Sequence, residues 1–132
     1  MHWSRYSTLL LAALAALALS SVALSAGGLS GTYKTTIKSP AQLKGTWTLA
    51  LAKGGKYTVT MSGQPVARGT YSSTSTTITF LRERGSGCNG VGRYAWKRVG
   101  KTVTFIRKRE APSCQGRAAV LAHRFTQVGS RP

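Results

Sequence analysis

The chain has 132 residues and a formal net charge of +17 at pH 7, because it contains 19 lysine and arginine residues but only two acidic ones. The acids are Glu83 and Glu110, and His123 is the single histidine beyond the first few residues. General acid–base catalysis and catalytic triads need sets of titratable groups that this composition does not supply. A metal centre needs a ligand cluster that the sequence also lacks. The composition therefore predicts a protein that is not an enzyme and that uses no cofactor and no metal.

The first residues have the pattern of a secretory signal peptide. Arg5 lies in a short basic segment, residues 9–19 are an unbroken run of Leu and Ala, and small residues follow. A membrane-spanning helix is the alternative, but it needs about 20 apolar residues, and this run is shorter and is followed by serines. We expect cleavage after Ser25 or Ala26. This predicts a signal peptide over residues 1–26 and one secreted domain over residues 27–132.

The sequence after the signal peptide predicts short antiparallel strands, since turn residues recur about every ten positions. A Lys-Gly-Gly-Lys turn at residues 53–56 predicts a hairpin, and Gly69 is expected to mark a bend or bulge. In each strand the large apolar side chains should face a core and the polar ones should face water. The first five strands are predicted over residues 31–38, 45–52, 57–62, 66–72 and 76–82.

The stretch from Cys88 to Cys114 predicts a disulfide-bonded hairpin with a turn at residues 100–101. One disulfide is expected, because export favours it and the sequence has neither the ligands of a metal site nor a C-x-x-C motif. Closing a loop of about 25 residues contributes roughly 3 kcal/mol. Alternation predicts that the inward-facing side chains of this hairpin are Tyr94, Trp96, Arg98, Val103, Phe105 and Arg107.

The pattern changes after Cys114. Residues 117–121 are rich in alanine and predict a short helical turn, and a last strand is expected at about residues 123–128. The total is eight strands without a long crossover connection. Such a meander is predicted to close into an up-and-down antiparallel barrel. The predicted fold class is therefore all-β, with at most one short helical turn near the C-terminus.

Short motifs occur in a definite order along this part of the chain: Gly31-x-Tyr33, Gly45-x-Trp47, Gly55-x-Tyr57, Gly69-x-Tyr71, Gly92-x-Tyr94-x-Trp96 and Cys114-x-x-Arg117. They resemble those of a family of small secreted bacterial lipocalin-like domains, over essentially the whole chain after the signal peptide. The glycine–tryptophan motif is also similar to the G-x-W signature of the calycin superfamily. This implies structural roles for Gly45 and Trp47 and an arginine packed over the tryptophan, with Arg124 as the candidate and Arg117 as the alternative.

The predicted barrel favours a binding function. An eight-stranded barrel is filled by side chains or holds one small ligand, which we expect to be apolar or anionic. A fully packed core is the alternative, because the inward aromatic side chains are large. The predicted ligand-binding residues are Trp47, Tyr57, Tyr71, Phe80, Tyr94, Trp96 and Phe105, with Arg82, Arg98 and Arg107 at strand ends around a mouth.

The positive charge supports a second hypothesis, in which the surface binds polyanions such as cell-wall polymer, anionic lipid or nucleic acid. Charge that serves only solubility is the alternative. No specific nucleic-acid site is expected, since the basic residues are scattered and the aromatic ones face inward. A third hypothesis is binding through the loop at residues 84–91. We expect a monomer without a membrane span, in which both glutamates form salt bridges with the neighbouring Arg82, Arg84 and Arg109.

Overall fold

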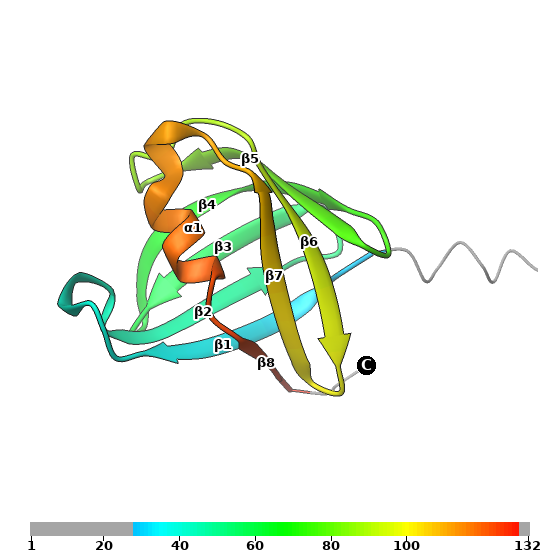
Figure 1. Cartoon of the computed structure of the whole chain (residues 1–132), viewed down its shortest axis with the longest axis horizontal. Coiled ribbons are helices and arrows are strands. Elements are labelled where there is room, and N and C mark those ends of the chain that lie inside the picture. Colours follow the sequence, from blue (N-terminus) through cyan, green and yellow to red (C-terminus); the bar gives the residue numbers. More distant parts are fainter. Residues whose placement is uncertain (1–27, 130–132) are drawn as a thin grey trace, which may run out of the picture.

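The computed structural model describes residues 28–129, which form a closed antiparallel barrel of eight strands (Figure 1). Each strand pairs with the next one in the chain, and the last pairs with the first. The predicted all-β, up-and-down fold is confirmed. The predicted signal peptide lies outside the described residues. The strands are β1 (Gly31–Ile37), β2 (Gly45–Leu51), β3 (Lys56–Met61), β4 (Gln64–Ser73), β5 (Thr77–Arg84), β6 (Gly92–Val99), β7 (Thr102–Arg109) and β8 (Phe125–Val128).

Helical structure in residues 28–129 is limited to short segments. A 3-10 turn η2 (Ala41–Leu43) precedes β2, and a second one, η3 (Pro112–Cys114), leads into the helix α1 (Gln115–Leu121). The predicted helical turn corresponds to α1, which lies beside β7 and over the interior of the barrel (Figure 1). No helix within this range is long and apolar enough to cross a membrane.

The alternation of side chains along the strands builds the core. Successive side chains of a strand point to opposite faces, so Trp47, Leu49 and Leu51 of β2 are buried while Thr46 is exposed. Aromatic rings then meet edge to face across the interior, which is a favoured geometry for such pairs. The ring centroids are 5.0 Å apart for Tyr57 and Phe80, 5.9 Å for Phe80 and Tyr94, and 5.7 Å for Phe105 and Phe125.

Two strands carry an extra residue that reverses this alternation near their C-terminal ends. In β5 the register shifts opposite Gly69, between the pairs Arg68–Arg84 and Thr70–Leu81, and Arg82 has a φ of 53°. In β7 the register shifts between the pairs Arg93–Arg109 and Tyr94–Arg107, which leaves Lys108 as the extra residue. A bulge of this kind re-aims the side chains that follow it. Glu83 and Glu110 therefore face inward, three residues after Phe80 and Arg107.

The predicted disulfide is present. Cys88 and Cys114 are joined, with 26 residues of separation along the chain and a Cα–Cα distance of 4.5 Å. Both side chains are buried. The bond ties the loop before β6 to the start of α1, and so holds the helix against the barrel.

Candidate functional site

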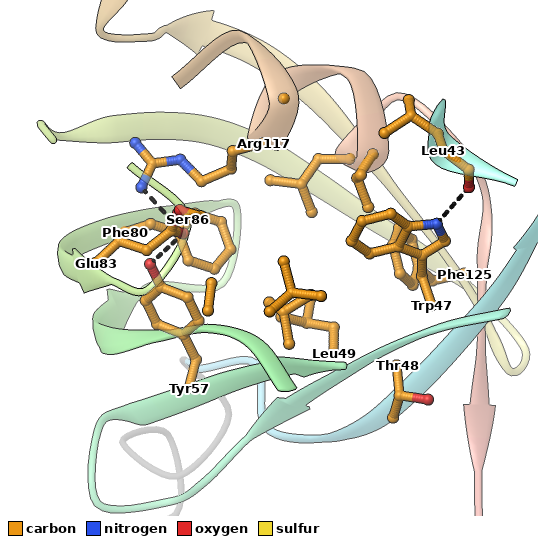
Figure 2. A pocket seen from close by; sticks show the side chains of 16 residues that line it. Leu43, Trp47, Thr48, Leu49, Tyr57, Phe80, Glu83, Ser86, Arg117 and Phe125 are labelled. Atoms are coloured by element: carbon orange, nitrogen blue, oxygen red, sulfur yellow. Dashed lines mark hydrogen bonds and ion pairs between the residues drawn. The ribbon is translucent and has the colours of Figure 1, made fainter. Parts of the chain in front are cut away.

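A mainly apolar cavity, partly open to solvent, lies between helix α1 and the strands of the barrel. Its volume is about 230 Å³, and its wall is formed by strands β2 to β5, α1 and the start of β8. Figure 2 shows Trp47 and Phe125 at one end of the cavity, and Arg117, Glu83 and Ser86 at the other. The apolar part of the wall consists of Leu43, Trp47, Leu49, Tyr57, Val59, Val66, Ala67, Phe80, Val120, Leu121 and Phe125.

The polar end of the cavity is built around Arg117, whose side chain is only 5 % exposed. Its Nε and Nη2 donate hydrogen bonds of 2.9 and 2.5 Å to the two carboxylate oxygens of Glu110, and Nη2 also donates to the Gly90 carbonyl at 3.1 Å. The guanidinium lies over the ring of Phe80, 5.9 Å from its centroid. The two hydrogen bonds between Arg117 and Glu110 form a bidentate pair, the geometry that makes arginine–carboxylate contacts strong and directional.

The second carboxylate, that of Glu83, faces the same guanidinium. Its Oε1 lies 3.7 Å from Arg117 Nη1, which is an ion-pair distance but too long for a hydrogen bond. Tyr57 donates its hydroxyl to Oε1 at 2.7 Å, and the Ser86 hydroxyl donates to Oε2 (Figure 2). Both oxygens of Glu83 therefore already accept hydrogen bonds from the protein.

Burial and hydrogen bonding shift the acidities in this cluster. Burial alone would raise the pKa of Glu110, but hydrogen bonds from Arg117 and Tyr94 outweigh it and hold the pKa below its ordinary value. Burial alone would lower the pKa of Arg117, but its hydrogen bonds to Glu110 and the nearby negative charge raise it. Burial and a hydrogen bond to a glutamate raise the pKa values of both Tyr57 and Tyr94. At neutral pH both tyrosines are therefore protonated and donate hydrogen bonds to the glutamates.

A glycine makes room for the buried ion pair. A Cβ atom on Gly92 would lie 2.6 Å from Arg117 Nη2 and 2.7 Å from Glu110 Oε2. The first residue of β6 must therefore lack a side chain, because any Cβ atom would clash with the ion pair that joins α1 to the end of β7.

The predicted ligand-binding residues divide into three groups. Trp47, Tyr57 and Phe80 line the cavity. Four others are packed elsewhere in the barrel and do not line it: the Tyr71 hydroxyl donates to the Ala52 carbonyl, and the Trp96 indole donates to the Thr74 and Thr77 carbonyls, while Tyr94 and Phe105 lie between β6, β7 and α1. The three arginines Arg82, Arg98 and Arg107 are exposed and also lie outside the cavity wall.

The expectation that these arginines face inward is wrong for Arg82, whereas the register pairs Arg98 with the buried Val103 and Arg107 with the buried Tyr94, on the inward side of the hairpin. At Arg82 the bulge reverses the alternation, so that Glu83 takes the inward position. Arg98 bends over the end of β6 and donates hydrogen bonds to Tyr33 and Gln127. Arg107 precedes the second bulge and its guanidinium extends toward Gln115 of α1, at 3.4 Å.

Gly45 and Trp47, the residues of the G-x-W motif, lie at the start of β2. Gly45 has a φ of 146°, and a Cβ atom there would lie 2.8 Å from the Ser62 hydroxyl oxygen. The Trp47 indole donates to the Leu43 carbonyl at 2.7 Å. Arg124 is exposed, whereas the alternative, Arg117, lies in the cavity wall and stacks on Phe80.

The sequence interpretation missed the polar end of the cavity. It assigned Glu83 and Glu110 to salt bridges with neighbouring arginines, and this is wrong, since both face Arg117. The spacing Cys114-x-x-Arg117 could have predicted this arginine, because it places Arg117 in the first turn of a helix that the disulfide anchors to the barrel. In residues 28–129 no group of three or more His, Cys, Asp or Glu side chains is arranged to hold a metal ion.

The chain matches no protein-family model, no curated protein and no solved structure. Its class is therefore defined by its architecture, which is an eight-stranded antiparallel barrel with one disulfide in the described range and a small cavity under a C-terminal helix. This architecture is consistent with a lipocalin-like fold.

Proposed function

We propose that this protein is a secreted, non-enzymatic member of a lipocalin-like family, and that it binds one small, mainly apolar molecule inside the barrel. The observation that carries the proposal is the apolar cavity of about 230 Å³ between α1 and strands β2 to β5. The signal-peptide pattern and the disulfide support secretion, because disulfides persist in oxidising compartments. Within residues 28–129, carboxylate side chains are confined to two glutamates engaged with Arg117, which supports a binding role over catalysis.

The volume of the cavity limits the size of the ligand. An apolar cavity of about 150 Å³ holds benzene, which has six non-hydrogen atoms. The same proportion gives about nine non-hydrogen atoms for the cavity of about 230 Å³ in this barrel. The ligand class is therefore a small molecule with a short apolar chain or one ring, rather than a long-chain lipid.

Filling the cavity tests the proposal. Ala67 of β4 faces the cavity, so Ala67→Leu would occupy part of the ligand volume. The matched control is Ala50→Leu, which adds the same atoms to the outward-facing side of β2. Native mass spectrometry at high salt of the protein from its own culture medium, before and after denaturation, would detect a released small molecule. We expect wild type and Ala50→Leu to carry it and Ala67→Leu to carry at least tenfold less; no released molecule, or equal loading, would contradict the proposal.

A second function, polyanion binding at the surface, is supported by the cross-strand pairs Arg68–Arg84 and Arg93–Arg109. Like charges placed directly opposite each other destabilise a sheet, and a bound anion would relieve the repulsion. Both carboxylate side chains of residues 28–129 are buried against Arg117, so none is left on the surface of this part to neutralise the pairs.

Salt dependence tests this second function. Affinity for heparin, used as a model polyanion, should fall steeply between about 50 and 200 mM NaCl, as counterion release requires. Arg84→Gln should weaken binding and reduce the slope, more than Lys53→Gln in the exposed hairpin turn. Affinity that is independent of salt, or equal effects of both variants, would contradict polyanion binding through these pairs.

A further inference from the structure

One buried hydrogen-bond donor at the polar end of the cavity has no acceptor. Arg117 Nη1 is buried and makes no hydrogen bond with any residue that the structure describes. Nε and Nη2 of the same guanidinium are fully engaged with Glu110 and Gly90. Buried polar groups are nearly always paired, so an unpaired donor in a cavity wall marks the place where a ligand atom or a water completes the set.

The open hydrogen-bonding capacity at this end is that of a donor. Glu83 Oε1 lies 3.7 Å from Nη1, and each Glu83 oxygen already accepts a hydroxyl hydrogen bond, one from Tyr57 and one from Ser86. A ligand group that reaches Arg117 Nη1 must therefore offer an acceptor. An ammonium group, which has only donors, does not match this end of the cavity.

The charge of the cluster excludes a second class of ligand. Glu83 and Glu110 contribute two negative charges against the one positive charge of Arg117, so the cluster is negative overall. A carboxylate ligand would add a third negative charge and would also lose its hydration in a mainly apolar cavity, which is costly without a dedicated cation. The positive charge of Arg117 is already committed to Glu110.

We propose that the cavity selects an uncharged compound with a hydrogen-bond acceptor, such as a ketone or ester of about nine non-hydrogen atoms, whose oxygen accepts a hydrogen bond from Arg117 Nη1 while its apolar body lies between Leu49, Val120 and Trp47. This inference rests on the proposed binding function and adds the chemistry of the polar group. It replaces the anionic alternative for the ligand. A site built to hydrogen-bond one polar group rejects analogues that leave its buried partner unpaired.

Isosteric probes test the selectivity on the wild-type protein. Isothermal titration at pH 7 compares methyl heptanoate with octanoate, which has the same size but carries a charge, and 2-octanone with octylammonium. We expect the ester and the ketone to bind at least tenfold more tightly than octanoate and octylammonium, respectively. Octanoate or octylammonium binding as tightly as its neutral counterpart would overturn the inference while leaving the cavity as a binding site. Failure of all four probes, together with no molecule released in native mass spectrometry, would overturn the binding function itself.

A charge variant gives an independent test of the same cluster. Glu83→Gln removes one negative charge but keeps an oxygen that can accept from Tyr57. The preference for methyl heptanoate over octanoate should then fall at least fivefold. Thr58→Lys, at an exposed position of β3, makes the same change in net charge at the surface and should leave the preference unchanged. An unchanged preference in Glu83→Gln, or an equal change in both variants, would overturn the electrostatic part of the inference; if Glu83→Gln does not fold, the wild-type probes decide alone.

Discussion

At the scale of single residues, Arg117 has two roles that different atoms of its guanidinium perform. Nε and Nη2 form the buried pair with Glu110, which joins α1 to the end of β7. Nη1 is buried without a hydrogen bond and lies 3.7 Å from Glu83 Oε1. Because the side chains of Arg117 and Glu110 are only 5 % and 1 % exposed, neither charge can turn to water if its partner is lost.

Removal of the Arg117 side chain should therefore destabilise the folded protein. We expect Arg117→Met to lower the free energy of unfolding by about 3–5 kcal/mol, the range found when one partner of a buried ion pair is removed. The measurement is urea denaturation at pH 7. Arg124→Met is the control, since Arg124 is exposed and its change should stay within about 0.5 kcal/mol. A loss for Arg117→Met no larger than that of the control would show that the buried pair is not stabilising.

At the scale of elements, the sequence predicts the strands well and the ends of two strands poorly. Turn residues and period-two alternation predict all eight strands, and the six predicted with explicit bounds lie within two residues of the observed ones. Gly69 marks the register shift between β4 and β5, as expected. The alternation does not show that the extra residues lie in β5 and β7, because the bulges follow the last inward apolar residue of each strand, Phe80 and Phe105. The residues beyond are mostly charged, so no apolar side chain reveals that the alternation has reversed. The polar end of the cavity depends on both reversals and could not be predicted from the pattern.

The bulge in β5 needs a glycine on the facing strand, and this gives a prediction. A Cβ atom on Gly69 would lie 2.6 Å from the Leu81 carbonyl oxygen and 2.7 Å from the Tyr57 ring. The first of these contacts is with backbone, so Gly69→Ala should cost about 1–3 kcal/mol, as other overpacked sites do. Thermal and urea denaturation would measure it, with Gly54→Ala as the control because a Cβ atom there meets nothing within 4 Å. Equal stability of the two variants would contradict a close approach at the bulge.

The disulfide connects the hairpin loop to α1 and can be tested as one element. The bond closes a loop with a sequence separation of 26, for which chain entropy predicts a loss of roughly 3–4 kcal/mol on removal. The double variant Cys88→Ser/Cys114→Ser should show this loss in urea denaturation, and the wild type should show the same loss on reduction. The double variant should not respond to the reductant. A smaller loss in both cases would mean that the packing of α1 alone holds the two segments together.

At the scale of the whole molecule, the charges are sorted by sign. In residues 28–129 the two carboxylate side chains lie inside the barrel with Arg117, while the other basic side chains lie mainly on the exposed face of the barrel. The interior therefore has a local negative cluster inside a molecule with a formal net charge of +17. This sorting separates the two proposed functions, because a neutral ligand in the cavity and a polyanion on the surface respond to different charges. Ketone affinity should be nearly independent of salt, and polyanion affinity should not.

Because both carboxylate side chains of residues 28–129 are buried with Arg117, we expect the loss of stability in acid to come from this buried cluster. The pKa of Glu110 is lowered in the folded state, where burial is outweighed by hydrogen bonds from Arg117 and Tyr94. A carboxylate of this kind stabilises the fold above its unfolded pKa of about 4.3, and this stabilisation is lost as the pH falls toward the folded pKa. The contribution of Glu110 to the free energy of unfolding should therefore stay constant from pH 7 to about pH 5.5 and decline below about pH 4.5.

Urea denaturation at a series of pH values from 7 to 3 measures this decline, and Glu110→Gln identifies its source. The variant should be less stable at pH 7, because Arg117 loses its charged partner, but its stability should fall less steeply below pH 4.5. The two curves should therefore converge in acid, where protonation of Glu110 leaves the wild type with the same neutral partner that the variant has at every pH. Parallel curves would mean that the decline comes from groups other than Glu110, and the buried pair would then not be the source of the acid sensitivity.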